Sequence, residues 1–248
     1  MEWTPSPRHL LRVGCISDVT ANWQPGTVLE VGAGTGDVTN RFVERGFTVT
    51  ATDLGSQSRQ LLRQRFGHEV TVVDDLESMT SAIDYLFAFE VLEHINDDLG
   101  ALRSWVAHLR PGGRVLISVP AHQRKFGDPD RAAGHVRRYE RHQLMALLDD
   151  AGLIEAELSN YGFPLGNAIR LTRTGINSVT RRRVDEPEAE TERMARTVDS
   201  GVATARTLNR LKRLSTPRLL APFVAIQSLA YQRDWSDGYV ATATRPPA

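Results

Sequence analysis

A glycine-rich loop in the first third of the sequence has the spacing of a ligand-binding turn. The apolar run that contains Glu30 leads into Gly32, Gly34 and Gly36, and a helix-like stretch follows. Glycine lets a backbone turn sharply and approach a ligand, and the start of a helix favours negative charge. Nicotinamide dinucleotide fingerprints have glycine or alanine where this chain has Asp37, and a carboxylate is unfavourable beside a pyrophosphate. The loop therefore predicts a nucleoside ligand whose nearest part is uncharged.

Three carboxylates have positions that suit such a ligand. Asp53 ends the second apolar run, where an acidic side chain accepts hydrogen bonds from ribose hydroxyls, and Asp75 follows the third run, where it could accept from an adenine amino group. Glu30 lies inside an apolar strand, and a buried carboxylate needs a partner such as a ligand ammonium or loop amides. We predict that all three bind ligand. The alternative for Asp53 and Asp75 is a solvated strand end.

The loop after the fifth apolar run is rich in side chains that can move or hold protons. Imidazole titrates near neutrality, so His135 is the first candidate for a general base and His122 the second. Tyr139 is a candidate for orienting a substrate, and the two arginines before it could anchor an acidic one. The alternative is that these residues build the loop through hydrogen bonds to carboxylates such as Asp130.

The sequence Glu90-x-x-Glu93-His94 follows the fourth apolar run. At the start of a helix its two carboxylates would face the same side with the imidazole beside them, a set that suits a divalent cation. His122 or His135 could then complete the site. The other interpretation is that Glu90 contacts the ligand and the remainder caps a helix. We favour this second interpretation and assign no metal ligand.

Short apolar runs alternate with helix-like stretches along residues 27–159, as in a parallel sheet covered by helices. We predict a helix that Ser56 caps and that turns Leu61, Leu62 and Phe66 toward the core. Another helix would extend to Leu109, and a third would start near residue 141. The predicted strands are residues 27–31, 48–53, 69–73, 83–89, 114–119, 153–159 and 239–244.

The chain changes character before the last predicted strand. Residues 185–192 are acidic, residues 194–214 have apolar side chains every three or four positions, and residues 219–226 are apolar almost all round. We interpret residues 161–237 as a helical lid for the substrate, inserted between a core at 1–160 with an N-terminal cap helix and a last strand with its tail at 238–248. The alternative is that the helix at 217–231 lies on a membrane surface or forms a homodimer.

Composition limits the range of partners and locations. The 30 basic and 30 acidic residues give zero formal net charge, so no nucleic-acid partner is expected. The single cysteine, Cys15, cannot form an intramolecular disulfide and is expected to be a packed thiol. No apolar run approaches the length of about 18 residues that a transmembrane helix needs. The expected location is the cytoplasm.

Several of these motifs together resemble class I methyltransferases that depend on S-adenosylmethionine (SAM). The resemblance covers about the first two-thirds of the chain and implies an α/β, Rossmann-like, seven-stranded, mostly parallel sheet with helices on both faces and an antiparallel last strand. The cofactor would be SAM and its product S-adenosylhomocysteine. The motifs that carry the resemblance are Val28-Leu29-Glu30-Val31-Gly32-Ala33-Gly34-Thr35-Gly36, then Asp53, then Asp74-Asp75-Leu76, then Phe89-Glu90-Val91-Leu92-Glu93-His94, then Leu109-Arg110-Pro111-Gly112-Gly113.

The resemblance also implies roles for individual residues. Glu30 would contact the methionine end of SAM, with Glu90 beside it, and Asp53 would hold the ribose, while Asp75 and Leu76 would face the adenine. The complete set of implied cofactor residues is Glu30, Gly32, Ala33, Gly34, Gly36, Asp53, Leu54, Asp75, Leu76 and Glu90. The series Gly134-His135-Val136-Arg137-Arg138-Tyr139 resembles a subgroup often found in bacterial natural-product and sugar-modifying settings.

Four functions follow from these patterns. The leading hypothesis is methyl transfer to O, N or C of a small molecule in bacterial secondary or sugar metabolism. A second is methylation of RNA or protein, in the RNA case with a metal at Glu90, Glu93 and His94. A third keeps the SAM fold for other chemistry or as a scaffold subunit, because a fold does not fix a function. An NAD-dependent oxidoreductase is the least favoured because of Asp37.

Overall fold

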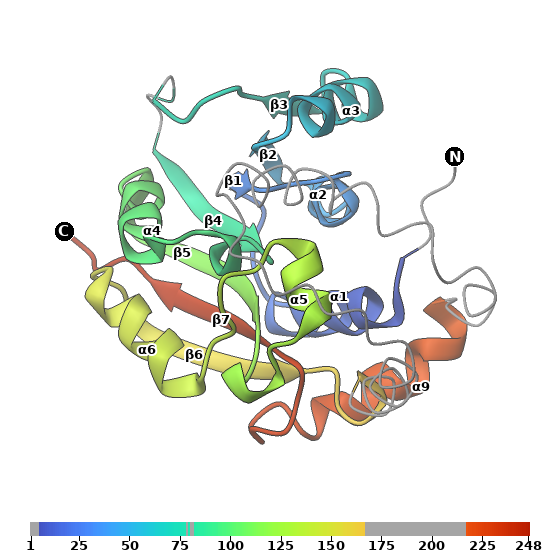
Figure 1. The fold of residues 1–248 in the computed structure, drawn as a ribbon. Helices are drawn as coiled ribbons and strands as arrows, with labels where there is room; N and C mark the ends of the chain where they lie inside the picture. The colour runs from blue at the N-terminus through green and yellow to red at the C-terminus, as the bar shows by residue number, and fades with distance from the viewer. Residues whose placement is uncertain (1–4, 78, 80–81, 167–216) are drawn as a thin grey trace.

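The computed structural model describes residues 5–77, 79, 82–166 and 217–248 (Figure 1). These residues form a seven-stranded sheet of order β3-β2-β1-β4-β5-β7-β6. Neighbouring strands are parallel except that β7 is antiparallel to both β5 and β6. The predicted sheet, with its antiparallel last strand, is therefore confirmed. Its strands are β1 (Thr27–Val31), β2 (Thr48–Thr52), β3 (Val70–Val72), β4 (Ile83–Phe89), β5 (Leu109–Pro120), β6 (Ile154–Tyr161) and β7 (Gly238–Thr244).

Helices cover both faces of the sheet, because alternate side chains of each strand point to opposite faces. Leu29 and Leu86 pack with the face that α4 (Asp98–Val106) and α6 (Arg141–Asp150) cover. Val28 and Phe87 pack with the face that α1 (Pro7–Val19), α2 (Asp37–Val43) and α3 (Ser56–Phe66) cover. Cys15 is buried in this second core, as expected for a packed thiol. The remaining described helices are η1 (Leu92–His94), η2 (Gln123–Lys125), α5 (Asp128–Ala133) and α9 (Pro217–Ser228).

The structure corrects several predicted boundaries. Gly55, not Ser56, is the N-cap of α3, and Leu61 points outward with 42% of its surface exposed, whereas Leu62 and Phe66 are buried. The helix expected to extend to Leu109 ends at Val106. Leu109 instead pairs with Ile83 in the sheet, so β5 begins five residues before the predicted start at residue 114. Apolar spacing alone could not separate the last helical turn from the first strand residue.

The end of the predicted insertion is α9, which packs on the N-terminal helix. The buried Gln227 side chain donates to the Leu11 carbonyl at 2.8 Å and accepts from the Gly162 amide at 3.0 Å, which ties α9 to both α1 and the end of β6. Ile226 of α9 and Leu229, directly after the helix, are 45% and 85% exposed. The amphipathic stretch at 194–214, and with it the lid, lies outside the described residues. None of the described helices is long and apolar enough to cross a membrane.

Candidate functional site

The glycine loop lies across the ends of β1 and β2. The Gly32 and Ala33 amides donate to the Thr52 carbonyl at 2.9 and 3.1 Å. All three glycines of the motif have positive φ, between +56° and +75°, which side-chain-bearing residues rarely adopt. A Cβ on Gly36 would lie 2.4 Å from the Phe66 ring, whereas a Cβ on Gly34 would meet no heavy atom within 4 Å. Gly36 therefore serves packing, and Gly34 borders open space.

Glu30 is buried behind this loop. It lies in register with Ala51 and Phe87 in the middle of the sheet and is 2% exposed. The Thr39 hydroxyl of α2 donates to its Oε2 at 2.7 Å. Burial raises the pKa of Glu30 to about 7, although the Thr39 hydrogen bond and the Arg12 charge favour the ionised form. The predicted buried acid thus exists, and it is poised to gain or lose a proton near neutrality.

Asp53 faces the same loop from the end of β2. Its Oδ2 accepts from the Gly34 amide and its Oδ1 from the Gly55 amide, both at 2.9 Å. The neighbouring Leu54 is 64% exposed, which is unusual for a leucine. The structure therefore brings Glu30, Gly34 and Asp53 together at the carboxyl ends of the strands, where ligands bind in sheets of this type.

The two residues predicted to face the adenine lie further along the carboxyl edge of the sheet, after β3. Asp75 is exposed and its Oδ1 accepts from the Glu77 amide at 2.5 Å, while Leu76 is half-buried against the core. Their position after β3 agrees with the sequence prediction. Their contact with a ligand stays a prediction.

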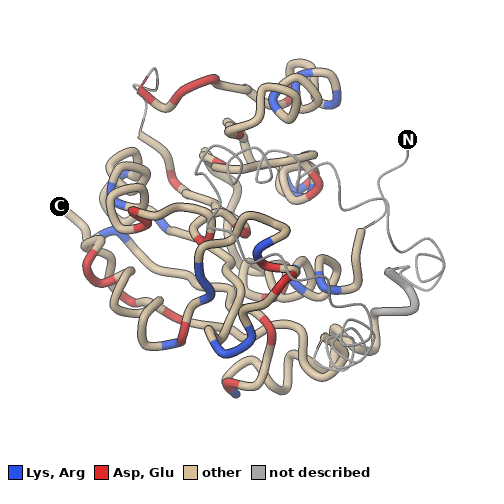
Figure 2. The backbone as a smooth tube through the Cα atoms, viewed as in Figure 1, with Lys and Arg blue, Asp and Glu red and all other residues tan. Residues whose placement is uncertain are grey.

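Glu90 ends β4 in a left-handed conformation with φ of +57°. Its carboxylate binds Arg8 at 2.9 Å and accepts from the Tyr161 hydroxyl at 2.9 Å, and Arg12 lies 3.6 Å away. Burial alone would raise the pKa of Glu90, but the two guanidiniums outweigh it and lower the pKa. Figure 2 marks the basic residues of α1, which is the helix that covers this part of the site.

The sequence prediction missed Arg8, Arg12 and Tyr161. Arg8 and Arg12 are four residues apart in α1 and so share one face of the cap helix. That spacing was a usable signal. Two arginines on the face of a cap helix that turns toward the core need an anionic partner. Nothing in the local sequence could connect Tyr161 to Glu90.

Glu93 is fully buried, and within the described part of the chain neither of its carboxylate oxygens has a hydrogen-bond partner. Ligand atoms of Glu93, His94 and His135 lie within 4.8 Å of one another. Burial and the nearby Glu90 raise the pKa of Glu93, and burial with the nearby His135 lowers the pKa of His94 to about 4. A carboxylate that has no hydrogen bond among the described residues and lies beside two imidazoles is a donor set that fits a divalent cation.

His135 is held by a buried ion-pair network. Asp130 Oδ1 lies 3.1 Å from His135 Nδ1 and accepts from Arg138 Nε at 2.8 Å, and Arg138 also lies 3.4 Å from Asp237. Burial raises the pKa of Asp130, but the hydrogen bond from His135 and the charge of Arg138 lower it to about 2. The carboxylate therefore stays ionised and fixes the imidazole with Nε2 toward Glu93, 3.9 Å from Oε1.

The structure separates the three residues predicted to act in catalysis. His122, with φ of +65°, lies between Glu140 at 3.3 Å and Asp234 at 3.6 Å. The Tyr139 hydroxyl donates to Asp98 of α4 at 2.7 Å. Only His135 lies beside the Glu90–His94 segment at the end of β4. Catalytic roles for His122 and Tyr139 stay predictions that these contacts do not support.

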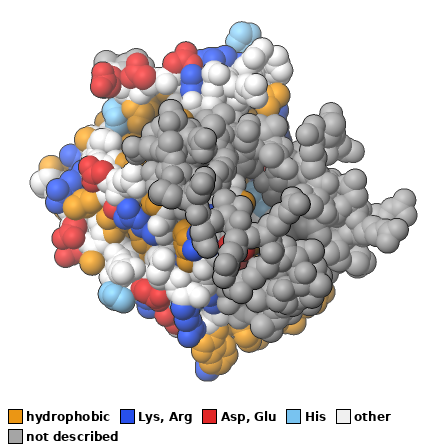
Figure 3. Space-filling view, in the orientation of Figure 1, with side chains coloured by type: hydrophobic (Ala, Val, Ile, Leu, Met, Phe, Trp, Pro, Cys, Tyr) orange, Lys and Arg blue, Asp and Glu red, His pale blue; other side chains and the backbone are white. Residues whose placement is uncertain are grey.

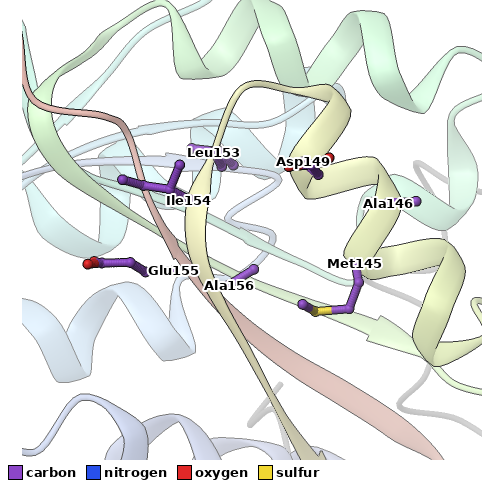
Figure 4. A pocket seen from close by; sticks show the side chains of 7 residues that line it. All are labelled: Met145, Ala146, Asp149, Leu153, Ile154, Glu155 and Ala156. Carbon is purple, nitrogen blue, oxygen red and sulfur yellow. The ribbon is translucent and has the colours of Figure 1, made fainter.

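A groove of about 490 Å³ between α6 and β6 is remote from these residues. Met145, Leu153, Ile154 and Ala156 line it (Figure 4). Ile154 pairs with Thr244, and Thr244 also pairs with Arg114, which in turn pairs with Tyr85 near the start of β4. The groove therefore lies toward the amino ends of the parallel strands. Ligands in such sheets bind at the opposite ends, and the groove is therefore not the candidate site.

Comparison with known proteins agrees with this geometry. A methyltransferase domain family model matches residues 8–154. A ubiquinone biosynthesis O-methyltransferase of Vibrio parahaemolyticus is 26% identical over 168 residues, which are 59% of this chain and 72% of that protein. One of Pseudomonas syringae pv. tomato is 34% identical over 117 residues, or 44% of this chain and 50% of that protein. The match thus spans only half the length of some relatives.

Solved structures share the fold at low identity. A putative methyltransferase of Haloferax volcanii, in complex with the Trm112 methyltransferase activator, has a TM-score of 0.58 at 14% identity and covers 96% of this chain and 91% of its own. The [4+2]-cyclase SpnF has a TM-score of 0.55 at 17% identity, with 99% and 87% covered. The phosphoethanolamine N-methyltransferase 2 of Haemonchus contortus, in complex with SAM, has a TM-score of 0.55 at 19% identity, with 96% and 52% covered.

The fold and the glycine-loop site define a class I SAM-dependent methyltransferase. The chain belongs to the methyltransferase domain family whose model it matches over residues 8–154.

Proposed function

We propose that this protein transfers the methyl group of SAM to an oxygen, nitrogen or carbon atom of a small molecule. The observation that carries the proposal is the convergence of Glu30, Gly34 and Asp53 at the carboxyl ends of β1 and β2, with open space over Gly34. Two carboxylates, with a glycine backbone between them that leaves room for a ligand, suit a nucleoside joined to an amino acid.

Each part of the cofactor has a partner of suitable chemistry. Glu30 would bind the ammonium group of the methionine part. The Glu30 carboxyl would ionise on binding, and the ammonium would be the partner that a buried carboxylate needs. Asp53 has lone pairs beyond those used by the two amides and would accept from the ribose hydroxyls. The exposed Leu54 would pack against the nucleoside, with Asp75 and Leu76 near the adenine. Arg12, whose buried Nε has no partner among the described residues, would bind the methionine carboxylate.

His135 is the proposed base for an acceptor that must lose a proton. In the transfer, an acceptor lone pair forms a bond to the methyl carbon while the carbon–sulfur bond breaks and its electrons stay on sulfur, which gives S-adenosylhomocysteine. Asp130 accepts from Nδ1, so Nε2, which faces Glu93 at 3.9 Å, is the nitrogen that would take the acceptor's proton. The enzyme must also align the acceptor with the methyl group and exclude water.

Calorimetry with SAM, S-adenosylhomocysteine and NAD tests the cofactor. We expect both sulfur nucleosides to bind and NAD not to bind; NAD binding without SAM binding would refute the proposal. His135→Ala tests the base, and we expect turnover to fall by about 100-fold or more with SAM affinity retained. An equal loss of turnover and affinity would indicate that His135 only builds the loop.

A second candidate function is metal-dependent methylation, which the orphaned Glu93 carboxylate supports. Glu93, His94 and His135 would hold the cation, and Glu90 would not, since Arg8 and Tyr161 already bind it. A bound cation would lower the pKa of an acceptor hydroxyl. Activity that survives a chelator unchanged, or a Glu93→Gln variant that still needs added metal, would exclude this site.

RNA as the acceptor has less support than a small molecule. On the side seen in Figure 3, described acidic and basic side chains are interspersed over the surface, which does not suit a polyanion.

Three further points also stay proposals: a role in secondary or sugar metabolism, a cytoplasmic location, and a homodimer through 217–231. The exposed Ile226 and Leu229 support the homodimer. SAM binding without transfer to any acceptor would favour other chemistry or a scaffold role.

A further inference from the structure

Asp37, the residue that argues against a dinucleotide, has a partner on the cap helix. It is the first residue of α2, directly after Gly36, and its Oδ2 lies 2.7 Å from His9 Nε2. Arg41, one turn further along the same helix, has its Nε 3.7 Å away from the same oxygen. The side chains of His9 and Asp37 are 13% and 22% exposed. The contact therefore links the glycine loop to α1 through a largely buried hydrogen bond.

His9 also contacts Arg12, and this second contact fixes its tautomer. Arg12 Nη2 lies 3.0 Å from His9 Nδ1. A guanidinium can only donate hydrogen bonds, so Nδ1 must accept, and Nε2 must carry the proton that it donates to Asp37. This arrangement needs a neutral ring, and burial indeed lowers the pKa of His9, which outweighs the opposing effect of Asp37. The direction of both hydrogen bonds is thus set.

The far end of Arg12 faces the buried acids of the site. Its Nη1 lies 3.6 Å from Glu90, and its charge acts on Glu30. A long flexible side chain loses rotamer freedom when it is held in one place. If His9 already holds the Arg12 side chain, less conformational entropy is lost when the ligand binds.

We propose that His9 is a positioning residue, held by Asp37, that orients the Arg12 guanidinium toward the amino-acid carboxylate of the bound sulfonium nucleoside. This inference rests on the proposed function, because it needs that ligand at Glu30 and Arg12. It also gives Asp37 a role that does not involve contact with the ligand. From the start of α2, Asp37 holds His9 of the cap helix α1 in place.

Two ligands separate this role from simple packing of α1. S-Adenosylhomocysteine carries the amino-acid carboxylate, and 5′-methylthioadenosine has the same adenosine and thioether without it. For His9→Ala we expect about 10-fold weaker binding of S-adenosylhomocysteine by calorimetry, the loss of one hydrogen bond to a charged group. Binding of 5′-methylthioadenosine should not change. His142→Ala, at an exposed position of α6, is the matched control and should bind both ligands as the wild type does.

A double-mutant cycle tests whether His9 acts through Arg12. In an Arg12→Ala background, His9→Ala should cause no further loss for S-adenosylhomocysteine. His9→Gln keeps an amide donor and an acceptor, and it should recover most of the affinity even if His9→Ala unfolds.

Three results would overturn the inference: unchanged affinity in His9→Ala, an equal loss for both ligands, or additive losses with Arg12→Ala. These differ from failure of the proposed function, in which the wild type itself would bind neither sulfur nucleoside.

Discussion

The proposed site has two halves, one for the cofactor and one for the acceptor, and they are held together in different ways. In the cofactor half, around β1 and β2, the carboxylate of Asp53 accepts from backbone amides, and Gly34 and Leu54 face open space or solvent. In the acceptor half, the loop after β5 is held by side-chain ion pairs, with Asp130 and Arg138 buried. Backbone amides thus position Asp53 against the glycine loop, whereas buried side-chain ion pairs hold the loop after β5.

This difference teaches where tolerance to mutation should lie. A site built on backbone amides keeps its shape when a side chain changes, so substitutions there should affect binding before stability. A site built on buried ion pairs should lose stability first, because an unpaired buried charge is costly. Four experiments test this contrast, beginning with the largest expected effect.

Arg138→Gln should destabilise the fold by about 3–5 kcal/mol, since it leaves the buried Asp130 without its guanidinium partner, whereas Asp237 keeps Arg8 and Lys125 nearby. Urea unfolding measures the loss. The matched control is Arg131→Gln, whose ion pair with Asp128 at 3.2 Å is largely exposed and should contribute less than about 1 kcal/mol. Similar losses in both variants would remove the distinction between the halves.

Gly34→Ala should weaken SAM binding by about 10- to 100-fold, because its methyl group would fill space left for the ligand. Gly152→Ala is the matched control, since Gly152 also has positive φ and open space but lies after α6, remote from the site. Both variants should lose about 1 kcal/mol of stability from backbone strain. Loss of SAM affinity in Gly152→Ala would show that strain, not occupancy, governs binding.

Glu30 predicts a pH dependence of SAM binding. Its pKa of about 7 is raised by burial, so the group becomes protonated as the pH falls below 7. The neutral acid cannot pair with the ligand ammonium, and affinity should fall by about tenfold per pH unit in that range. Calorimetry at stepped pH measures the slope. Glu30→Gln should bind weakly with little slope just below pH 7, and an unchanged slope in that variant would assign the titration to another group.

Tyr139→Phe should cost about 1 kcal/mol of stability and leave turnover unchanged, because the hydroxyl donates to Asp98 on α4. The matched control is Tyr239→Phe, which also removes a hydroxyl bound to a carboxylate, that of Asp234 at 2.6 Å. Unfolding and steady-state assays check both variants. A large fall in turnover for Tyr139→Phe, with SAM affinity intact, would restore the catalytic role that the sequence predicts for it.

Sequence reasoning could predict residues for the proposed cofactor half because the signals there are local. The glycine spacing, the acid within the first strand and the acid at the end of the second each sit next to the element that positions them. The alternation of apolar runs with helix-like stretches also predicted a parallel sheet, and the resemblance to the methyltransferase family predicted that β7 is antiparallel. The boundary at Leu109 was wrong, because an apolar residue at helical spacing fits a helix end and a strand start equally well.

Only the tertiary structure decided the acceptor half. His122, His135 and Tyr139 lie within one loop, yet their partners come from different elements: Asp234 before β7, Asp130 in α5 and Asp98 in α4. The pairing of Glu90 with Arg8, and the absence of a hydrogen-bond partner for the Glu93 carboxylate among the described residues, likewise depend on segments far apart in the chain. Local spacing determines which side chains share a loop or a helix face. Which charges meet across the core depends on how the elements pack, and that is not encoded in any short stretch of sequence.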